Sequence, residues 1–328
     1  MRNAMHLTLP RLKEILRRQD PPSWGSNYDP AIRATREEAP ARSRFAQVWH
    51  ERLGRYCHVL SNVEQKALLL ALFNSSLFEL QEQRILACEP RPHPLASHSF
   101  AAGLILPPLR GTIDVCERLD MLERHLWIYV DHPDGTGRVP VPAPFVGDLL
   151  LCLQDQDGPY CVNWTIKGTV NEFHLRIAGN KPAKSIEKEM VAVRARYAIE
   201  ELYYRDAHIP TVQIVDRDIP EMFIQNIKSF LLLKHRAADM DQELYKEICE
   251  RLQASILTSQ PPLEILLSIM HRHGLTLEIA KAAFCRALWQ RDVRAELMDE
   301  VILIDRPLKS ERRDPLQVFS TWFVRQRP

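Results

Sequence analysis

The chain has 328 residues, 45% of them hydrophobic and 26% charged, and its formal net charge at pH 7 is only +1. This composition is ordinary for a globular protein of one or two domains, and the balanced charge excludes a general polyanion binder. The chain has no run of 18 apolar residues, no secretory signal pattern and no CxxC pair among its seven cysteines. We therefore expect a cytoplasmic protein without a membrane span, zinc site or disulfide framework.

Residues 1–54 are expected to form a basic N-terminal arm. Residues 1–55 contain 11 Lys and Arg against 6 Asp and Glu, and residues 7–19 have the pattern of a short basic helix. The arm either contacts nucleic-acid phosphates, which makes binding salt-dependent, or is simply solvated. The candidate DNA-binding side chains are Arg42, Arg44, Arg52 and Arg55.

The first strong signal for a helix begins at Ser61. Ser61 followed by Glu64 three residues later matches a capping box, and an apolar periodic run follows. Glu64 has a plain structural role in this motif, worth on the order of 1 kcal/mol. After the helix, residues 77–86 alternate in the manner of a strand.

The segment 145–168 predicts a β-hairpin that brings an acid and a lysine together. Asp157-Gly158 is a strong two-residue turn signal between apolar and β-branched runs. If these residues form the loop, opposite residue numbers sum to 315, and Asp148 pairs with Lys167. Directly opposite side chains share a face of the sheet, and a slip of one residue would separate them.

Two interpretations of this pair are open at this point. An exposed cross-strand salt bridge is worth roughly 0–1 kcal/mol and has no further role. The alternative is a metal-dependent nuclease site, in which an aspartate binds a divalent cation beside a lysine. Phosphodiester hydrolysis requires both a hard cation on oxygen ligands and a nearby positive group.

The remaining pattern predicts an α/β protein with two domains after the arm. A helix over 185–206, a strand over 211–215 and a helix from about Pro220 to His235 complete a mixed β-sheet core flanked by helices, at 55–238. Residues 239–328 are mainly helical. A helix from Pro262 to Gly274, a second helix over 275–292 and a strand-like piece over 300–308 predict a winged-helix-like C-terminal domain.

Several blocks of the sequence, in this order, resemble TnsA-type transposon end-cleaving endonucleases. They are HVLSNVEQKALLLALFNSSLFELQEQ, GDLLL, TIK, and RARYAIEELYYRDAHIPTVQIVDRDI with NIKSFL. The resemblance covers residues 55–235 well and 239–328 more loosely. It implies a restriction-endonuclease-like core of the PD-(D/E)xK class followed by a winged-helix-like domain.

The resemblance also implies roles for individual residues. Glu64 and Asp148 correspond to ligands of Mg²⁺ or Mn²⁺, and Lys167 to the lysine beside the attacking water. Family members usually have Gln or Glu two positions before this lysine, where this chain has Thr165. A hydroxyl is a poorer ligand than a carboxylate, so the Ile166 carbonyl or a water is the alternative third contact.

The function that the resemblance implies is DNA transposition. The chain would be the endonuclease subunit of a heteromeric transposase in the bacterial cytosol, cutting transposon-end DNA on the strand whose 5′ end belongs to the transposon. Its partners would be a DDE-type (TnsB-like) transposase and an AAA+ ATPase (TnsC-like) regulator. Two other functions stay open: a stand-alone restriction-type defence nuclease, and a non-catalytic adaptor that docks the recombinase.

Overall fold

The computed structural model describes residues 7–132, 134–175 and 183–326, and it has a mixed α/β fold. These residues divide into two compact units. The first contains the described residues up to Leu68, the segment Ser76–Arg217 and the residues from Trp322 on; the second contains Leu69–Ser75 and Asp218–Thr321. The described part of the N-terminal arm thus belongs to the first unit, and the second unit resumes at Asp218, before the expected limit at residue 239.

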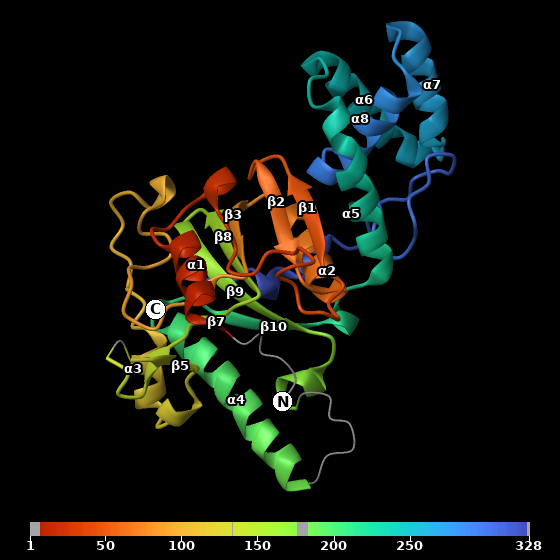
Figure 1. Cartoon of the computed structure of the whole chain (residues 1–328). Helices are drawn as coiled ribbons and strands as arrows, with labels where there is room; N and C mark the ends of the chain where they lie inside the picture. The colour runs from red at the N-terminus through yellow and green to blue at the C-terminus, as the bar shows by residue number, and fades with distance from the viewer. Residues whose placement is uncertain (1–6, 133, 176–182, 327–328) are drawn as a thin grey trace. The chain divides into compact units, whose positions relative to one another are not determined.

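The first unit contains all the strands of the described residues (Figure 1). Its helices are α1 (Leu9–Gln19), α3 (Thr112–Arg118) and α4 (Ala183–Arg205), and α2 (Asn62–Phe73) begins in it. Its strands are β1 (Ala46–His50), β2 (Arg55–Val59), β3 (Leu77–Glu82), β4 (Ile85–Leu86), β5 (Trp127–Asp131), β6 (Arg138–Pro142), β7 (Phe145–Val146), β8 (Leu149–Asp155), β9 (Gly158–Lys167) and β10 (Thr211–Val215).

A four-stranded sheet in the order β10-β9-β8-β3 is the centre of this unit. Strand β8 is antiparallel to both β9 and β3, whereas β10 is parallel to β9. A parallel pair needs a crossover connection, and α4 lies in the chain between β9 and β10. The pairs β1-β2, β4-β7 and β5-β6 form small separate sheets. The alternation of strands and helices predicted this class of fold.

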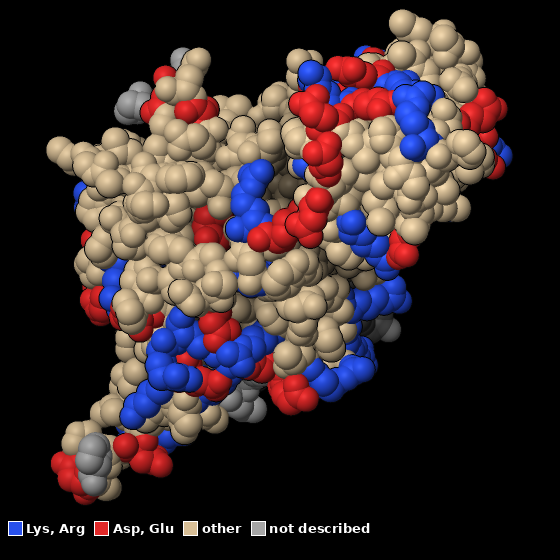
Figure 2. Space-filling model, turned by 90° about the horizontal axis from the view of Figure 1, so that it is seen from above, with Lys and Arg blue, Asp and Glu red and all other residues tan. Residues whose placement is uncertain are grey.

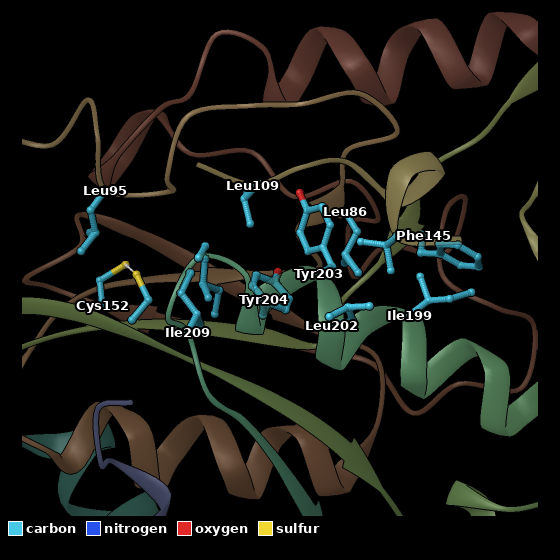
Figure 3. Close-up of a cluster of buried hydrophobic side chains, with 14 of the residues drawn as sticks. Leu86, Leu95, Leu109, Phe145, Cys152, Ile199, Leu202, Tyr203, Tyr204 and Ile209 are labelled. Carbon is cyan, nitrogen blue, oxygen red and sulfur yellow. Dashed lines mark hydrogen bonds between the residues drawn. The ribbon is translucent and has the colours of Figure 1, made fainter. Parts of the chain in front are cut away.

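The hydrophobic core lies between one face of the sheet and α4. The apolar run of β8 is buried throughout Leu149–Leu153, as expected for a strand covered on both faces. Figure 3 shows side chains of α4 packed with residues from the β4 and β7 region: Ile199, Leu202, Tyr203, Tyr204, Leu86 and Phe145. The opposite face is covered at Trp164, which is fully buried against the rings of Trp322 and Phe323.

The register of the β8–β9 hairpin differs from the predicted one by two positions. Asp155 pairs with Gly158 and Leu149 with Trp164, so that opposite numbers sum to 313 rather than 315. The residue opposite Asp148 is therefore Thr165, and Lys167 is a diagonal neighbour. A shift of two residues preserves the face of every side chain, because the side-chain period of a strand is two.

The turn sequence accounts for this register. The four residues from Asp155 to Gly158 have Asp first and Gly last, which is the preference of a type I turn. Asp155 Oδ1 accepts a hydrogen bond from the backbone N–H of Asp157 at 2.8 Å, as an Asx-type turn requires. The same register places Cys152 directly opposite Cys161, with the two Sγ atoms 3.7 Å apart, rather than diagonally.

The N-terminal arm is held by ion pairs of its own. Helix α1 confirms the predicted basic helix, but two of its three arginines, Arg11 and Arg18, are paired within the fold. Arg18 is buried and its guanidinium donates to both oxygens of Glu38, at 2.7 and 2.9 Å. Arg11 donates to Glu14 and to Glu38. A large part of the positive charge counted in this segment is therefore neutralised within the fold.

The second unit is helical, with α5 (Glu221–Leu233), α6 (Gln242–Thr258), α7 (Pro262–His273), α8 (Leu277–Gln290) and α9 (Pro315–Val318). The predicted limits of α7 are confirmed: Pro262 occupies its first turn and Gly274 ends it with φ +68°. The strand expected over 300–308 is wrong, since this segment has no strand. Its backbone bonds elsewhere: Ile302 N–H donates to Asn226 Oδ1, and Ile304 O accepts from Leu263 N–H.

Charged side chains of both signs are interspersed on the face shown in Figure 2, in keeping with the net charge of +1. Within the described part of the chain, no helix is both long enough and apolar enough to cross a bilayer.

Candidate functional site

The carboxylate of Asp148, directly before β8, lies against the end of β9. Lys167 Nζ donates a hydrogen bond to Asp148 Oδ2 at 3.0 Å, and the backbone N–H of Ile166 donates to the same oxygen at 2.7 Å. Lys167 Nζ also donates to the carbonyl oxygen of Ile166 at 2.5 Å. The structure thus brings together the acid and the lysine named from the sequence, although they are diagonal rather than opposite.

The surroundings of Lys167 keep its side chain charged. Burial lowers the pKa of Lys167, but the negative charge of Asp148 and the hydrogen bond to it outweigh this effect, and the pKa lies above its ordinary value. The ring of Tyr197, on α4, lies 5.9 Å from Nζ and adds a cation–π contact. At neutral pH Lys167 is therefore a fixed positive charge and hydrogen-bond donor, not a proton acceptor.

Glu64 caps the start of α2 in a variant of the capping box, in which its carboxylate bonds to the Ser61 hydroxyl and to the backbone of Leu60. Its backbone N–H donates to Ser61 Oγ at 3.2 Å, and Ser61 Oγ donates to Glu64 Oε1 at 2.9 Å. Glu64 Oε2 accepts from the backbone N–H of Leu60 at 2.9 Å. The structural role foreseen for Glu64 is thus present, and any ligand role would be additional to it.

Glu64 is also electrostatically linked to Asp148. Only 8% of Glu64 is exposed. Burial, and next the negative charge of Asp148, raise the pKa of Glu64 to about 7, whereas the hydrogen bonds from Leu60 and Ser61 and the charge of Lys167 lower it. Two carboxylates in one buried site cannot both be ionised without an energetic cost. A divalent cation between them would remove this cost.

Thr165 faces α4 and is bonded there. Its hydroxyl donates to Glu200 Oε1 at 3.0 Å, and Asn163 Nδ2 donates to the same oxygen at 3.0 Å. Arg196, one turn earlier on α4, donates to Glu200 Oε2 at 2.7 Å. Glu200 is buried and was not identified from the sequence. The sequence did contain one indication: Glu200 lies on the same side of α4 as the apolar residues Ile199 and Tyr203, where a carboxylate is unusual.

Gln83, between β3 and β4, was also missed. Its side-chain Nε2 donates to Glu64 Oε2 at 3.2 Å, and its backbone N–H donates to the carbonyl oxygen of Asp148 at 3.0 Å. One residue thus contacts both acids of the candidate site. Gln83 is 4% exposed and has a φ of +49°, which is uncommon for a residue other than glycine. Backbone conformations of this kind cluster at functional sites.

The four arginines named as DNA contacts have different environments. Arg55 is buried, pairs with both oxygens of Glu82 at 2.6 and 2.9 Å, and is therefore not free to bind phosphate. Arg52 is exposed but donates to the carbonyl oxygen of Leu77. Arg42 and Arg44 are exposed. Arg42 and Arg44 are therefore the two remaining candidates for contacts with phosphate.

The donor atoms at the site are oxygens, which suit Mg²⁺ or Mn²⁺. They are the carboxylates of Glu64 and Asp148, the amide of Gln83 and the Ile166 carbonyl, although this carbonyl already accepts from Lys167. The described ranges contain no cluster of three or more His, Cys, Asp or Glu side chains suited to a metal. A cation at this site would therefore have two carboxylate ligands, and neutral oxygens would complete its coordination.

Neither the protein-family models nor the curated proteins include a match to this chain.

Proposed function

We propose that the chain is a Mg²⁺- or Mn²⁺-dependent DNA endonuclease, acting as the subunit of a heteromeric transposase that cleaves at the 5′ ends of the transposon. The observation that carries this proposal is the convergence of Asp148 and Lys167, joined by a hydrogen bond of 3.0 Å, beside the buried Glu64. The four-stranded mixed sheet flanked by helices supports a restriction-endonuclease-like core. The ordered sequence blocks that resemble TnsA-type endonucleases supply the transposition context.

Each of the three side chains has a distinct role in this proposal. Glu64 and Asp148 would hold the cation through carboxylate oxygens. The bound cation would supply charge neutralisation at the phosphate and lower the pKa of a water. Lys167, which stays protonated, would donate hydrogen bonds to the phosphate oxygens or to the attacking water once the cation competes for Asp148. Such a fixed donor stabilises charge that develops in the transition state.

Binding to DNA would depend on partner proteins as well as on this chain. The net charge of +1 and the internal pairing of Arg11, Arg18 and Arg55 leave little positive charge for phosphates. Arg42 and Arg44 would contribute sequence-independent contacts. A DDE-type transposase that recognises the transposon end would bring the chain to its substrate, and an AAA+ ATPase regulator would bind the mainly helical C-terminal segment 239–328.

The test is cleavage of supercoiled donor DNA with transposon ends, in the presence of Mg²⁺ and a DDE-type partner transposase. We expect Asp148→Ala and Lys167→Ala each to slow 5′-end cleavage by at least about a hundredfold. Matched controls are Asp157→Ala, in the turn of the same hairpin, and Lys13→Ala on α1; both side chains are exposed. Cleavage by the two site variants at the wild-type rate would refute the assignment.

The capping contacts of Glu64 favour a second candidate, a non-catalytic adaptor. In that case Glu64 serves only helix α2, and Asp148–Lys167 is a structural pair. An adaptor predicts assembly with the recombinase and no cation-dependent cutting of the 5′ strand by the wild-type chain. Cutting of plasmid DNA without any partner would instead indicate a stand-alone restriction-type nuclease.

A further inference from the structure

The strand registers place three polar residues in one row across the sheet. In β3 and β8, Glu82 pairs with Leu149, and the hydrogen bond from Gln83 N–H to Asp148 O extends this ladder by one residue. In β8 and β9, Leu149 pairs with Trp164, so the next pair is Asp148 with Thr165. Asp148 therefore lies between Gln83 on one side and Thr165 on the other.

The two neighbours of Asp148 differ in their bonding. The Thr165 hydroxyl donates to Glu200 on α4 at 3.0 Å. Gln83 instead directs its amide to Glu64, at 3.2 Å. The nitrogen Nε2 is the amide atom that faces Glu64, and the other amide atom, Oε1, is an acceptor. Oε1 of Gln83 accepts no hydrogen bond from the part of the protein that the structure describes.

The backbone at Gln83 is held in a costly conformation by its surroundings. A positive φ at a residue with a Cβ costs on the order of 1 kcal/mol, and glycine would avoid this cost. The conformation is fixed by two backbone bonds, from Gln83 N–H to Asp148 O at 3.0 Å and from Ala31 N–H to Gln83 O at 3.1 Å. The result is a buried amide kept beside the carboxylate of Glu64, on a backbone bonded to that of Asp148.

We propose that Gln83 supplies the third protein ligand of the divalent cation through Oε1, completing the site of Glu64 and Asp148 from the β3 side of the sheet. This inference rests on the proposed function. The amide oxygen is a neutral, hard donor of the kind that these cations accept. It takes the place of the Gln or Glu side chain that the resemblance to TnsA-type endonucleases led us to expect at position 165.

The experiment measures Mn²⁺ binding to the full chain without DNA, by the loss of the free-ion signal in electron paramagnetic resonance. Gln83→Gly removes the side chain at a position where the backbone favours glycine, and we expect binding at least about tenfold weaker. Gln83→Glu supplies a carboxylate oxygen, and we expect binding at least as tight as wild type. The control is Gln81→Ala, for which wild-type affinity is expected. Gln81 is a buried glutamine in β3 whose Nε2 bonds to Ser23 O.

The Gln83→Glu variant distinguishes two roles of Gln83: a ligand of the cation, or a residue that only orients Glu64. An orienting donor is lost in this variant and replaced by a repelling charge, so weaker binding by Gln83→Glu would overturn the inference. Unchanged binding by Gln83→Gly would also overturn it.

Asp148→Ala distinguishes failure of the inference from failure of the proposed function. If Asp148→Ala abolishes binding while Gln83→Gly does not change it, only the role of Gln83 is refuted. If wild type binds no Mn²⁺, or Asp148→Ala binds it as tightly as wild type, the proposed nuclease site is refuted and the role of Gln83 with it.

Discussion

The raised pKa of Glu64 predicts that neutralising this side chain flattens the pH dependence of stability. The pKa of Glu64 rises from its ordinary value of 4.5 to about 7, first through burial and next through the charge of Asp148. Between these two pH values the folded chain binds more protons at this site than the unfolded chain does. The free energy of unfolding therefore falls as the pH rises from about 4.5 to about 7. The loss is at most about 3 kcal/mol, at about 1.36 kcal/mol per pKa unit.

The assay is urea unfolding in EDTA at about pH 5 and about pH 8, with wild type and Glu64→Gln compared. Glutamine keeps a carbonyl oxygen to accept from the backbone N–H of Leu60 but has no proton to lose. We expect wild type to lose up to about 3 kcal/mol more than Glu64→Gln between the two pH values. Glu89→Gln, which changes an exposed glutamate, should retain the wild-type dependence.

Asp148→Asn tests the second cause of the shift. Removing the charge of Asp148 should bring the pKa of Glu64 closer to 4.5 and reduce the pH dependence in part. Addition of Mn²⁺ should stabilise wild type more at about pH 8 than at about pH 5, because the cation competes with the proton for Glu64. Equal pH dependence in wild type and Glu64→Gln would refute the raised pKa of Glu64, and equal pH dependence in wild type and Asp148→Asn would refute the electrostatic link between the two acids.

Two further predictions concern stability alone. Arg55→Ala leaves the buried carboxylate of Glu82 without its partner and should cost about 3–5 kcal/mol in urea unfolding. Arg44→Ala, at an exposed position, should change stability by less than about 0.5 kcal/mol, and an equal effect of the two variants would contradict the buried pair. Trp164→Ala should cost about 3–5 kcal/mol because the indole is fully buried, whereas Trp49→Ala, at 46% exposure, should cost far less. Similar melting temperatures for the two tryptophan variants, followed by circular dichroism, would contradict this core assignment.

The elements best predicted from the sequence are those with distinct residues at their ends. Helix α7 begins with Pro262 in its first turn and ends at Gly274, and both residue types act through local backbone geometry. Strand β10 was also placed correctly, at Thr211–Val215, because a short β-branched run lies between polar and proline residues. The strand expected over 300–308 was predicted wrongly. The segment has the apolar alternation of a strand, but no strand of the described residues pairs with it.

The meeting of Asp148 and Lys167 was predictable even though the register was not. The turn signal was assigned to Asp157-Gly158, whereas Gly158 in fact forms the last pair of the hairpin with Asp155. Assigning the loop to Asp157-Gly158 therefore predicted a strand register that is wrong by two residues. The convergence survived because a two-residue slip leaves each side chain on its face, and a lysine is long enough to reach across the diagonal.

No local pattern identifies the side chains that complete the site, because their positions depend on tertiary pairing. Gln83 contacts Glu64 and Asp148 only because β3 is the strand beside β8, and residues 83 and 148 are far apart in sequence. Glu200 contacts Thr165 only because α4 crosses back over the sheet between β9 and β10. A sheet of the same strands in another order would retain the acid–lysine pair of the β8–β9 hairpin and lose both glutamine and glutamate contacts. The hairpin therefore specifies the Asp148–Lys167 pair locally, whereas the strand order decides which neutral oxygen lies near it.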